Sequence, residues 1–498
     1  MWKDKPLLLI MLTGIFFRLL AVIFSKGFGM HDDHFLIIEA SQSWVDGYDY
    51  NSWLPAANSS AITPSGHSFF YTGLHYFLFR LLKFIGITDA QTKMYIVRFL
   101  HALLSLSIVY YGYRITEKIS NTPTAKVVGL LLSIYWFMPF LSVRNLIEFV
   151  CIPPLIYATW LLIINRDTNK KGIYFLIGLI LGIAFSIRFQ TVLFTGGIFL
   201  ALLIQKRFIP LILSILGFAA CAVLIQGGTD YFVWGAPFVE FKEYIRYNIE
   251  SANAYISQGW YTYFLTLGGI LIPPVSLFLL FGFFRNWKKH LILFLPSFIF
   301  LVFHSYFPNK QERFIAPIIP FIIILGYAGW SEFQNSSEFW MKRKKLLHSC
   351  WVFFWILNTI PLFFISVTYS KKSRVESMTY IESKKDVKSL IMEESTRDDF
   401  LMPPRFYLEK WVPYYGVTSL NSVEKLYKDL HNLPVSAQPN YVVFINQENI
   451  EKRVDEFKKY YPALTYETTI ESSFIDKVVH YLNPINKNQT FYVYKIGS

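Results

Sequence analysis

Long apolar runs alternate with short polar segments through roughly the first three-quarters of the chain. The first run, Leu7 to Phe24, follows Lys3 and Lys5. A membrane-spanning helix needs about 20 mostly apolar residues. The pattern therefore predicts an α-helical polytopic membrane protein with about 11 transmembrane helices, the first of them uncleaved. The predicted spans lie at 7–24, 97–115, 125–142, 148–165, 172–187, 190–204, 209–226, 262–283, 289–306, 314–330 and 347–367.

Basic residues between these runs predict the orientation of the protein. Loops rich in Lys and Arg stay in the cytoplasm. The basic pairs and clusters fall on one side under this count, at 114–118, 166–171, 206–207, 285–289 and 342–345. The opposite, outward side then holds a long first loop at 27–96, a second loop at 227–261 and everything after residue 369. We expect function on that side.

One apolar stretch, Phe69 to Ile85, would break this parity if it crossed the membrane. It carries His75, Arg80 and Lys83, which favours an amphipathic helix lying in the interface. A twelfth span is the alternative.

The pattern changes after residue 369. Helical periodicity at Ser422 to Leu430 and at Glu448 to Tyr460 alternates with strand-like runs at Tyr441 to Ile445 and Phe491 to Ile496. This is typical of a small soluble α/β domain. The predicted organisation is a transmembrane catalytic domain at 1–369, whose first outward loop at 27–96 holds interfacial helices, and a C-terminal α/β domain at 370–498.

Composition agrees with a membrane protein, because 53% of residues are hydrophobic and only 16% are charged. The formal net charge is +13, and nearly all of the excess lies before residue 370. The basic residues thus follow the membrane loops, and we expect no nucleic-acid partner. Cys151, Cys221 and Cys350 lie far apart in apolar runs, which predicts neither a disulfide framework nor a zinc site.

The first outward loop opens with two adjacent carboxylates, Asp32 and Asp33, between His31 and His34. A carboxylate beside a second one at a partly desolvated interface has a raised proton affinity, which suits a general base. A metal site or an ordinary solvated turn remains an alternative at this point.

A second group, Arg144, Asn145 and Glu148, lies at the outward end of two predicted spans. Ionisable groups at membrane depth usually face a cavity or one another. Arg144 and Glu148 would share one face if helical, so a structural ion pair is the alternative to a site. Arg188, in a tight outward turn, is a weaker signal.

Lys310, Glu312 and Arg313 lie between two spans on the outer side, against the positive-inside preference. Two cations there suit a phosphate, with Arg offering paired donors and Lys a point charge. Snorkelling onto lipid headgroups is the alternative. The second outward loop, with Asp230 and Tyr231, is rich in aromatic residues and suits an aromatic belt, a sugar-binding surface or both.

These segments together offer a general base, cations that can bind a phosphate, and aromatic side chains beside lipid. Such groups suit the transfer of a sugar from a polyprenyl-phosphate donor. The chain has no glycine-rich nucleotide motif.

These motifs resemble those of the dolichyl-phosphate-mannose-dependent α-mannosyltransferases of the GT-C superfamily, which includes the GPI-anchor and N-glycan lipid mannosyltransferases. The run from His31 to Phe35 is similar to the family's His-Pro-Asp-Glu-x-Phe signature, and the run from Lys310 to Phe314 to its His-Lys-Glu-x-Arg-Phe signature. The resemblance covers roughly residues 10–330. The chain departs from it in lacking a proline before Asp32 and in carrying Asp33, Asn309 and Gln311 in place of Glu, His and Glu.

The resemblance implies an inverting glycosyltransferase that moves a sugar, mannose by the analogy, to a lipid-linked or cell-envelope glycan. It implies Asp32 and Asp33 as catalytic residues and Lys310 and Arg313 as ligands of the donor phosphate. It implies no cofactor, although a divalent metal near the two aspartates stays open. The residues implied in substrate positioning are His31, His34, Arg144, Asn145, Glu148, Arg188, Asp230, Tyr231 and Glu312.

The expected partners are the lipid-linked donor, a glycan or glycolipid acceptor and membrane lipid. Richness in Ile, Phe, Tyr and Lys suits an AT-rich bacterium, so we expect a bacterial inner membrane with a periplasmic site, or the ER membrane if the source is eukaryotic. The alternatives are a GT-C transferase of another sugar, of the aminoarabinose or protein O-mannosyl type, a transporter or flippase of lipid-linked glycans, and a scaffold that binds through its tail.

Overall fold

The computed structural model describes residues 5–55, 64–168, 170–252, 254, 257–396, 401–435, 437–484 and 488–497. The chain folds into two compact units. The first is formed by Met1–Val22, Ser52–Leu74 and Val97–Ser366, and the second by Ile23–Asn51, His75–Ile96 and Val367–Ser498. Much of the first outward loop therefore groups with the tail, an association that the hydrophobic pattern does not reveal.

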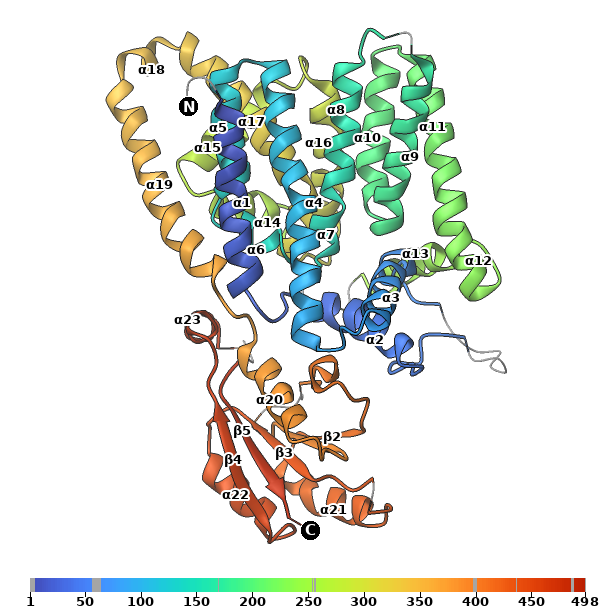
Figure 1. The fold of residues 1–498 in the computed structure, drawn as a ribbon. Coiled ribbons are helices and arrows are strands. Elements are labelled where there is room, and N and C mark those ends of the chain that lie inside the picture. Colours follow the sequence, from blue (N-terminus) through green and yellow to red (C-terminus); the bar gives the residue numbers. More distant parts are fainter. Residues whose placement is uncertain are drawn as a thin grey trace. The chain divides into compact units, whose positions relative to one another are not determined.

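The first unit is a bundle of helices (Figure 1). Six helical segments are long and apolar enough to cross a membrane, and five shorter apolar helices accompany them among the described residues. Each predicted span contains a helix, so the prediction of a helical polytopic membrane protein is confirmed. The helices are α1 (Pro6–Phe24), α4 (Ala90–Ile119), α5 (Thr122–Ile134), α6 (Met138–Leu141), α7 (Ile147–Val150), α8 (Ile152–Ile164), α9 (Lys171–Ile187), α10 (Thr191–Ile204), α11 (Phe208–Cys221), π-helix η2 (Ala222–Gly227), α12 (Gly228–Trp234), α13 (Val239–Glu250), α14 (Thr262–Ile270), α15 (Val275–Arg285), α16 (Leu291–Tyr306), 3₁₀-helix η3 (Glu312–Ile318), α17 (Ile319–Ser336), α18 (Glu338–Lys342) and α19 (Lys344–Ser366).

Two predicted boundaries were wrong. The span expected at 262–283 is divided into α14 and α15. Two consecutive prolines, Pro273 and Pro274, lie between them, and each lacks the backbone N–H that an α-helix uses. The helix expected to end at residue 226 continues through η2 and α12 to Trp234, so the second outward loop begins as helix.

The stretch expected in the interface is a helix, α3 (Phe69–Phe84). It is absent from the described helices that are apolar enough to span a membrane. A twelfth span is therefore not favoured by its composition.

Close contact between α15 and α17 depends on glycine. A Cβ added to Gly282 would lie 1.9 Å from the backbone oxygen of Gly326, and one added to Gly326 would lie 2.3 Å from the oxygen of Leu279. Such distances exclude any larger side chain. Helices in membranes pack closely through small residues of this kind.

A buried cation lies inside the first span. The Arg18 guanidinium donates to the Oγ of Ser105 (2.8 Å) and to the carbonyl oxygens of Gly14 (3.3 Å) and Ser133 (3.2 Å). Ser133 belongs to the last turn of α5, where carbonyl groups lack helical donors. Arg18 therefore satisfies a helix end, and we assign it a structural role.

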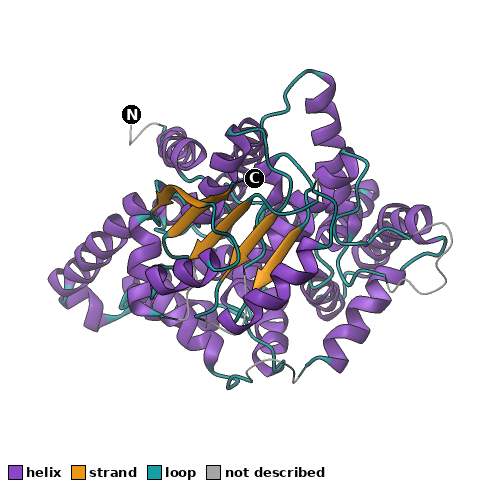
Figure 2. Cartoon of the chain, turned by 90° about the horizontal axis from the view of Figure 1, so that it is seen from below, coloured by secondary structure: helices purple, strands orange, loops and turns teal. Residues whose placement is uncertain are grey.

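The C-terminal part of the second unit is built on a five-stranded mixed sheet of order β2-β1-β3-β5-β4, seen as the orange strands in Figure 2. β1 pairs in parallel with β2 and β3, whereas β5 pairs antiparallel with β3 and β4. The predicted small C-terminal α/β fold is confirmed. The elements of this unit are π-helix η1 (Asp33–Glu39), α2 (Ala40–Val45), α20 (Lys372–Ser383), β1 (Leu390–Glu393), η4 (Arg405–Leu408), β2 (Tyr414–Val417), η5 (Leu420–Ser422), α21 (Val423–His431), β3 (Tyr441–Ile445), α22 (Ile450–Lys458), β4 (Leu464–Ile470), α23 (Phe474–Leu482) and β5 (Phe491–Ile496).

One buried ion pair joins α22 to the sheet. Arg453 donates to a carboxylate oxygen of Glu393 at the end of β1, and its Nη2 also donates to the carbonyl oxygen of Ile445 (2.8 Å). Both side chains are fully enclosed. Because the two enclosed charges compensate each other, the pair fixes α22 against β1 and β3.

Removing one member of this pair should destabilise the second unit. Glu393→Ala leaves the Arg453 charge buried without its carboxylate, so we expect the free energy of unfolding of this unit to fall by about 3–5 kcal/mol. Pulse proteolysis of the detergent-solubilised protein measures it. Glu424→Ala, which breaks the exposed pair with Lys428, is the control and should leave proteolysis unchanged. Equal effects of the two variants would contradict the role of Glu393.

Candidate functional site

We name the run His31, Asp32, Asp33 and His34 the acidic motif. It lies in the second unit at the start of a π-helix. Asp33 opens η1 and is buried, whereas Asp32 precedes the helix and is half-exposed. Short π-helical segments are rare and occur frequently at functional sites. Asp32 and Asp33, which the sequence does not distinguish, thus differ in how deeply their carboxylates are buried.

The two histidines of the motif also differ. His34 is buried between the rings of Phe28 (centroids 4.3 Å apart) and Tyr407 (5.4 Å), with Nε2 3.4 Å from Oε1 of Glu39. Burial lowers the pKa of His34 although Glu39 raises it, so the imidazole is neutral at pH 7. His31 is exposed and stacks on Phe35 at 4.3 Å. His34 thus packs the motif against η4.

Two cations from the tail lie beside this motif. The Lys371 ammonium lies 4.6 Å and the Arg374 guanidinium 5.2 Å from the ring centroid of Phe28. Arg374 also donates to the carbonyl oxygen of Met402 (3.0 Å). Burial lowers the pKa of Arg374 to about 10, which still leaves it charged at neutral pH. The tail therefore supplies positive charge next to the acidic motif.

In the first unit, three separate motifs meet at one carboxylate. Oε1 of the fully buried Glu148 lies 3.0 Å from Nη2 of Arg188 and 3.5 Å from Nε of Arg313. Both guanidinium groups also lie over the ring of Phe314, at 5.4 Å and 5.7 Å from its centroid. The cluster carries two positive charges and one negative charge. We name Glu148, Arg188 and Arg313 the arginine cluster.

The alternative interpretation of Arg144 and Glu148, a structural ion pair on one helix face, requires a helix that the structure does not have. Residues 142–146 are not helical, and α7 begins at Ile147, so the two side chains do not share a helix face. Arg144 lies over the ring of Phe140 at 4.4 Å and lines a cavity of about 10 Å³ with His101. Asn145, the next residue in the chain, is also buried.

Lys310 and Arg313 occupy different environments. The Lys310 ammonium is nearly buried and donates to the carbonyl oxygens of Gln258 (2.9 Å) and Phe307 (2.7 Å). Burial lowers its pKa. Glu312 is exposed at the start of η3, whereas Nε of Arg313 also donates to Oε1 of Gln311 (2.8 Å). Of these three residues, Arg313 is the one joined to Glu148 by an ion pair in the described structure.

Asp230 lies in a buried polar network, whereas its neighbour Tyr231 is exposed. Nε2 of Gln226 donates to Asp230 (2.7 Å) and to Glu240 (2.9 Å), and a hydrogen bond joins the two carboxyl groups. Glu240 also accepts from the backbone nitrogen of Phe69 (3.0 Å). The network ties the start of α3 to η2, α12 and α13.

We expect the Glu240 proton to make stability depend on pH. Burial, then the charge of Asp230, raises the pKa of Glu240 from 4.5 to about 9. Between these values the folded protein binds more protons than the unfolded chain, so the free energy of unfolding should fall as the pH rises. Glu240→Gln, which cannot ionise, should reduce this slope in thermal unfolding measured from pH 5 to 9. An unchanged slope would contradict a protonated Glu240.

Sequence reasoning missed Glu240, Arg374 and His304. His304 is buried near the end of α16, where its Nδ1 donates to the carbonyl oxygen of Phe300 (2.8 Å), and its ring lies 6.4 Å from that of Phe314. An ionisable residue inside an apolar run was a usable signal for it. Glu240 and Arg374 carry no such signal, because both follow the spans in polar sequence.

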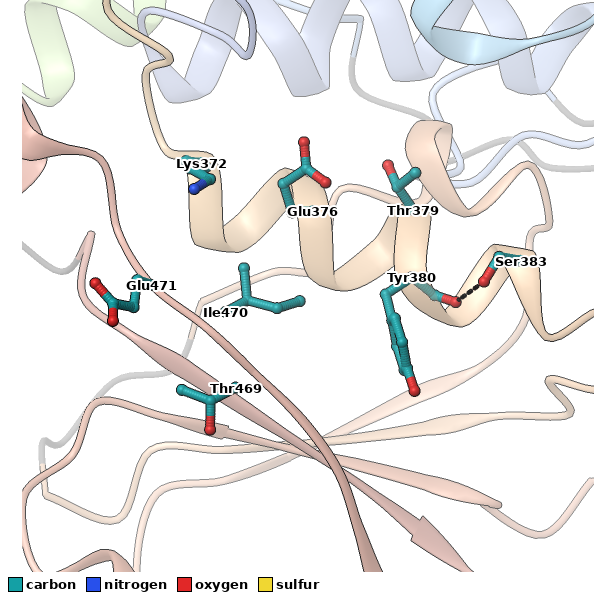
Figure 3. A pocket seen from close by; sticks show the side chains of 8 residues that line it. All are labelled: Lys372, Glu376, Thr379, Tyr380, Ser383, Thr469, Ile470 and Glu471. Carbon is teal, nitrogen blue, oxygen red and sulfur yellow. Dashed lines mark hydrogen bonds between the residues drawn. The ribbon is translucent and has the colours of Figure 1, made fainter.

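A separate open groove of about 590 Å³ lies between α20 and β4 (Figure 3). Seven of its eight lining residues carry a polar group, and Tyr380, which donates to Glu467 (2.8 Å), points from α20 toward the sheet. No sequence-predicted site residue lines it. The lining residues are Lys372, Glu376, Thr379, Tyr380, Ser383, Thr469, Ile470 and Glu471.

Among the described residues, no group of three or more His, Cys, Asp or Glu side chains is arranged to hold a metal ion.

Solved structures with this arrangement define the class of the fold. The chain is similar to ArnT from Cupriavidus metallidurans in the apo state, with a TM-score of 0.61 at 12% identity over 99% of this chain and 98% of that one. It is also similar to the oligosaccharyltransferase AglB from Archaeoglobus fulgidus, with a TM-score of 0.53 at 9% identity over 94% and 73% of the two chains. The fold is that of the GT-C glycosyltransferases.

The chain belongs to the Alg9-like mannosyltransferase family, whose model matches residues 9–397. It is 22% identical over 305 residues to GPI alpha-1,2-mannosyltransferase 3 of Homo sapiens, covering 60% of this chain and 53% of that protein. It is 21% identical over 443 residues to mannosyltransferase APTG1 of Arabidopsis thaliana, covering 83% and 75%. The match thus spans about half the length of the human relative and three-quarters of the plant one.

Proposed function

We propose that this chain transfers mannose from a polyprenyl-phosphate donor to a glycan or lipid-linked acceptor on the outward face of the membrane. The arginine cluster is the observation that carries the proposal. Membership of the Alg9-like mannosyltransferase family supports the sugar. Two structural neighbours support the donor class, since ArnT has been solved with undecaprenyl phosphate and AglB with a dolichol-phosphate.

The charges of the arginine cluster suit a sugar phosphodiester. Arg188 and Arg313 outnumber Glu148, which leaves one net positive charge for a donor phosphate that carries one negative charge. Departure of the sugar adds a second negative charge to that phosphate. Guanidinium groups already fixed by Glu148 stabilise this charge as it develops, without rearranging during the reaction. Lys310 retains one N–H beyond its two carbonyl contacts for the same ligand.

The acidic motif supplies the base in this proposal. Asp32 or Asp33 takes the proton of the acceptor hydroxyl while its oxygen bonds to the anomeric carbon and the bond from that carbon to the phosphate oxygen breaks. A single displacement inverts the configuration. Interacting carboxylates share their titration, so single variants are needed to separate the two.

The remaining predicted residues are assigned to positioning. His31, Tyr231 and Glu312 are exposed and suit contact with substrate, whereas His34 and Asp230 act through the packing around them. Arg144 and Asn145, which are buried and lie close to Glu148 in the chain, belong to the same assignment.

We also propose that the reaction needs no divalent metal. It takes place, in this proposal, in a bacterial inner membrane, at its periplasmic face.

Radiolabel transfer in proteoliposomes tests the function. Purified protein receives polyprenyl-phosphate mannose, or a nucleotide-mannose control, together with a glycolipid extract from the host. We expect transfer from the lipid donor alone, retained in EDTA and lost in Arg313→Met. Absence of transfer from every lipid-phosphate sugar would reject the transferase, and transfer from another sugar alone would reject mannose.

A further inference from the structure

The amphipathic helix α23 is built with its polar side inward. Asp476 is the buried residue of this helix, and its Oδ2 accepts from Oγ of Ser473 (2.8 Å) and from the backbone nitrogen of Lys372 (3.4 Å). Helices of soluble domains turn their apolar stripe toward the core. In α23 the buried contact with the rest of the unit is made instead by a carboxylate.

The apolar side of α23 faces outward. Tyr481 is 85%, Leu482 75% and Phe474 65% exposed, and Val478, between them on the same face, is also exposed. Residues at i, i+4, i+7 and i+8 form one continuous helical stripe. Four exposed apolar side chains side by side on a surface helix indicate a binding surface for an apolar partner.

The chain itself places this stripe close to the bilayer. The last span, α19, ends at Ser366, and Lys372, which binds Asp476, follows six residues later. Six residues extend over about 20 Å at most. In any orientation of the unit, the hydrogen bond to Lys372 keeps Asp476 within roughly that distance of the end of a membrane span.

A second connection joins the start of α20 to the segment that follows another membrane span, α1. The segment after α1, which ends at Phe24, pairs with the segment after α19. The backbone nitrogen of Ser370 donates to the carbonyl oxygen of Lys26 (3.1 Å), and Gly27 forms a parallel β-bridge with Ser370. A Cβ on Gly27, where φ is +74°, would lie 1.9 Å from the oxygen of Ser370. The chain segments that follow both spans therefore meet just before α20, to which α23 is bonded through Asp476.

We propose that α23 lies in the interface of the membrane that the chain spans, with its apolar stripe at the boundary between headgroups and acyl chains. Short amphipathic helices bind there through their apolar face. Tyr481 places an aromatic ring with a polar tip at the level where tyrosine is enriched. The side that carries Asp476 then faces the sheet, and Lys477, next to Tyr481 around the helix, reaches water. This interaction is independent of the proposed transferase activity.

Spin labelling of the full-length protein in nanodiscs tests the location of α23. Cys350, which is not fully buried, is first replaced by serine, whereas Cys151 and Cys221 are buried. Nitroxides are then attached at Leu482→Cys and Phe474→Cys on the stripe and, as controls, at His480→Cys on the side of Asp476 and Tyr466→Cys on β4. We expect the ratio of oxygen to nickel-complex accessibility to be several-fold higher at the stripe than at the controls.

Three outcomes would overturn the proposal. Equal ratios at all four positions would place the stripe in water. Labels at 474 and 482 shielded from both reagents would place it against protein. Spin–spin broadening that disappears on dilution with unlabelled protein would assign the stripe to a second copy of the chain.

Discussion

Asp32→Asn combined with Asp33→Asn is expected to lower sugar transfer at least 10²-fold, within the range of about 10²–10⁴ that a positioned general base contributes. Asparagine retains the size and hydrogen-bonding capacity of each side chain but cannot take a proton at neutral pH. The loss should appear in kcat, since deprotonation of the acceptor belongs to the chemical step. Transfer of radiolabelled mannose in proteoliposomes measures it.

The single variants separate the two carboxylates. Asp33 is buried at the start of η1 and Asp32 is half-exposed before it, so only one substitution should reproduce most of the loss. Asp429→Asn, an exposed acid on α21, is the control and should retain full transfer. Full activity of the double variant with normal membrane insertion would remove the base from the acidic motif.

Glu148→Ala is expected to have the second large effect, on stability as well as activity. It leaves the Arg188 and Arg313 charges facing each other in a buried site without their shared carboxylate. Breaking a buried ion pair costs about 3–5 kcal/mol, because the remaining charge is uncompensated. We therefore expect a markedly lower unfolding temperature in detergent.

A triple variant distinguishes charge from shape. Adding Arg188→Met and Arg313→Met to Glu148→Ala removes the unpaired charges, so stability should recover while transfer stays lost. Glu332→Ala, which breaks an exposed pair with Lys289, is the control and should change the unfolding temperature little. A stable Glu148→Ala protein, or a triple variant with normal transfer, would contradict the role of the arginine cluster.

The spans could be predicted because lipid imposes a simple requirement. A crossing helix must be long and apolar, so the run from Leu7 to Phe24 indicates α1 within one residue. The same clarity holds for β3, whose apolar run at Tyr441–Ile445 is a buried central strand. β4 was missed, because Leu464–Ile470 is an edge strand with a polar, largely exposed sequence.

The candidate site was predicted in its residues but not in its partners. Arg188 and Arg313 were each identified from an ionisable group at a membrane boundary. Their meeting at Glu148 depends on tertiary packing, whereas sequence spacing offered only Arg144 as a possible partner, on the condition that the segment is helical, and residues 142–146 are not. Glu240 and Arg374 were missed, since their importance comes from the buried Asp230 and the Phe28 ring beside them.

The packing of His34 between Phe28 and Tyr407 has a consequence for biosynthesis. The acidic motif leaves the ribosome early, but Arg374 and Tyr407 beside it follow more than 300 residues later. At 5–20 residues per second, the motif waits roughly 20 to 70 seconds for these neighbours. During that time a charged, incompletely packed segment stands beside newly inserted helices. Synthesis of η4 therefore completes the enclosure of His34.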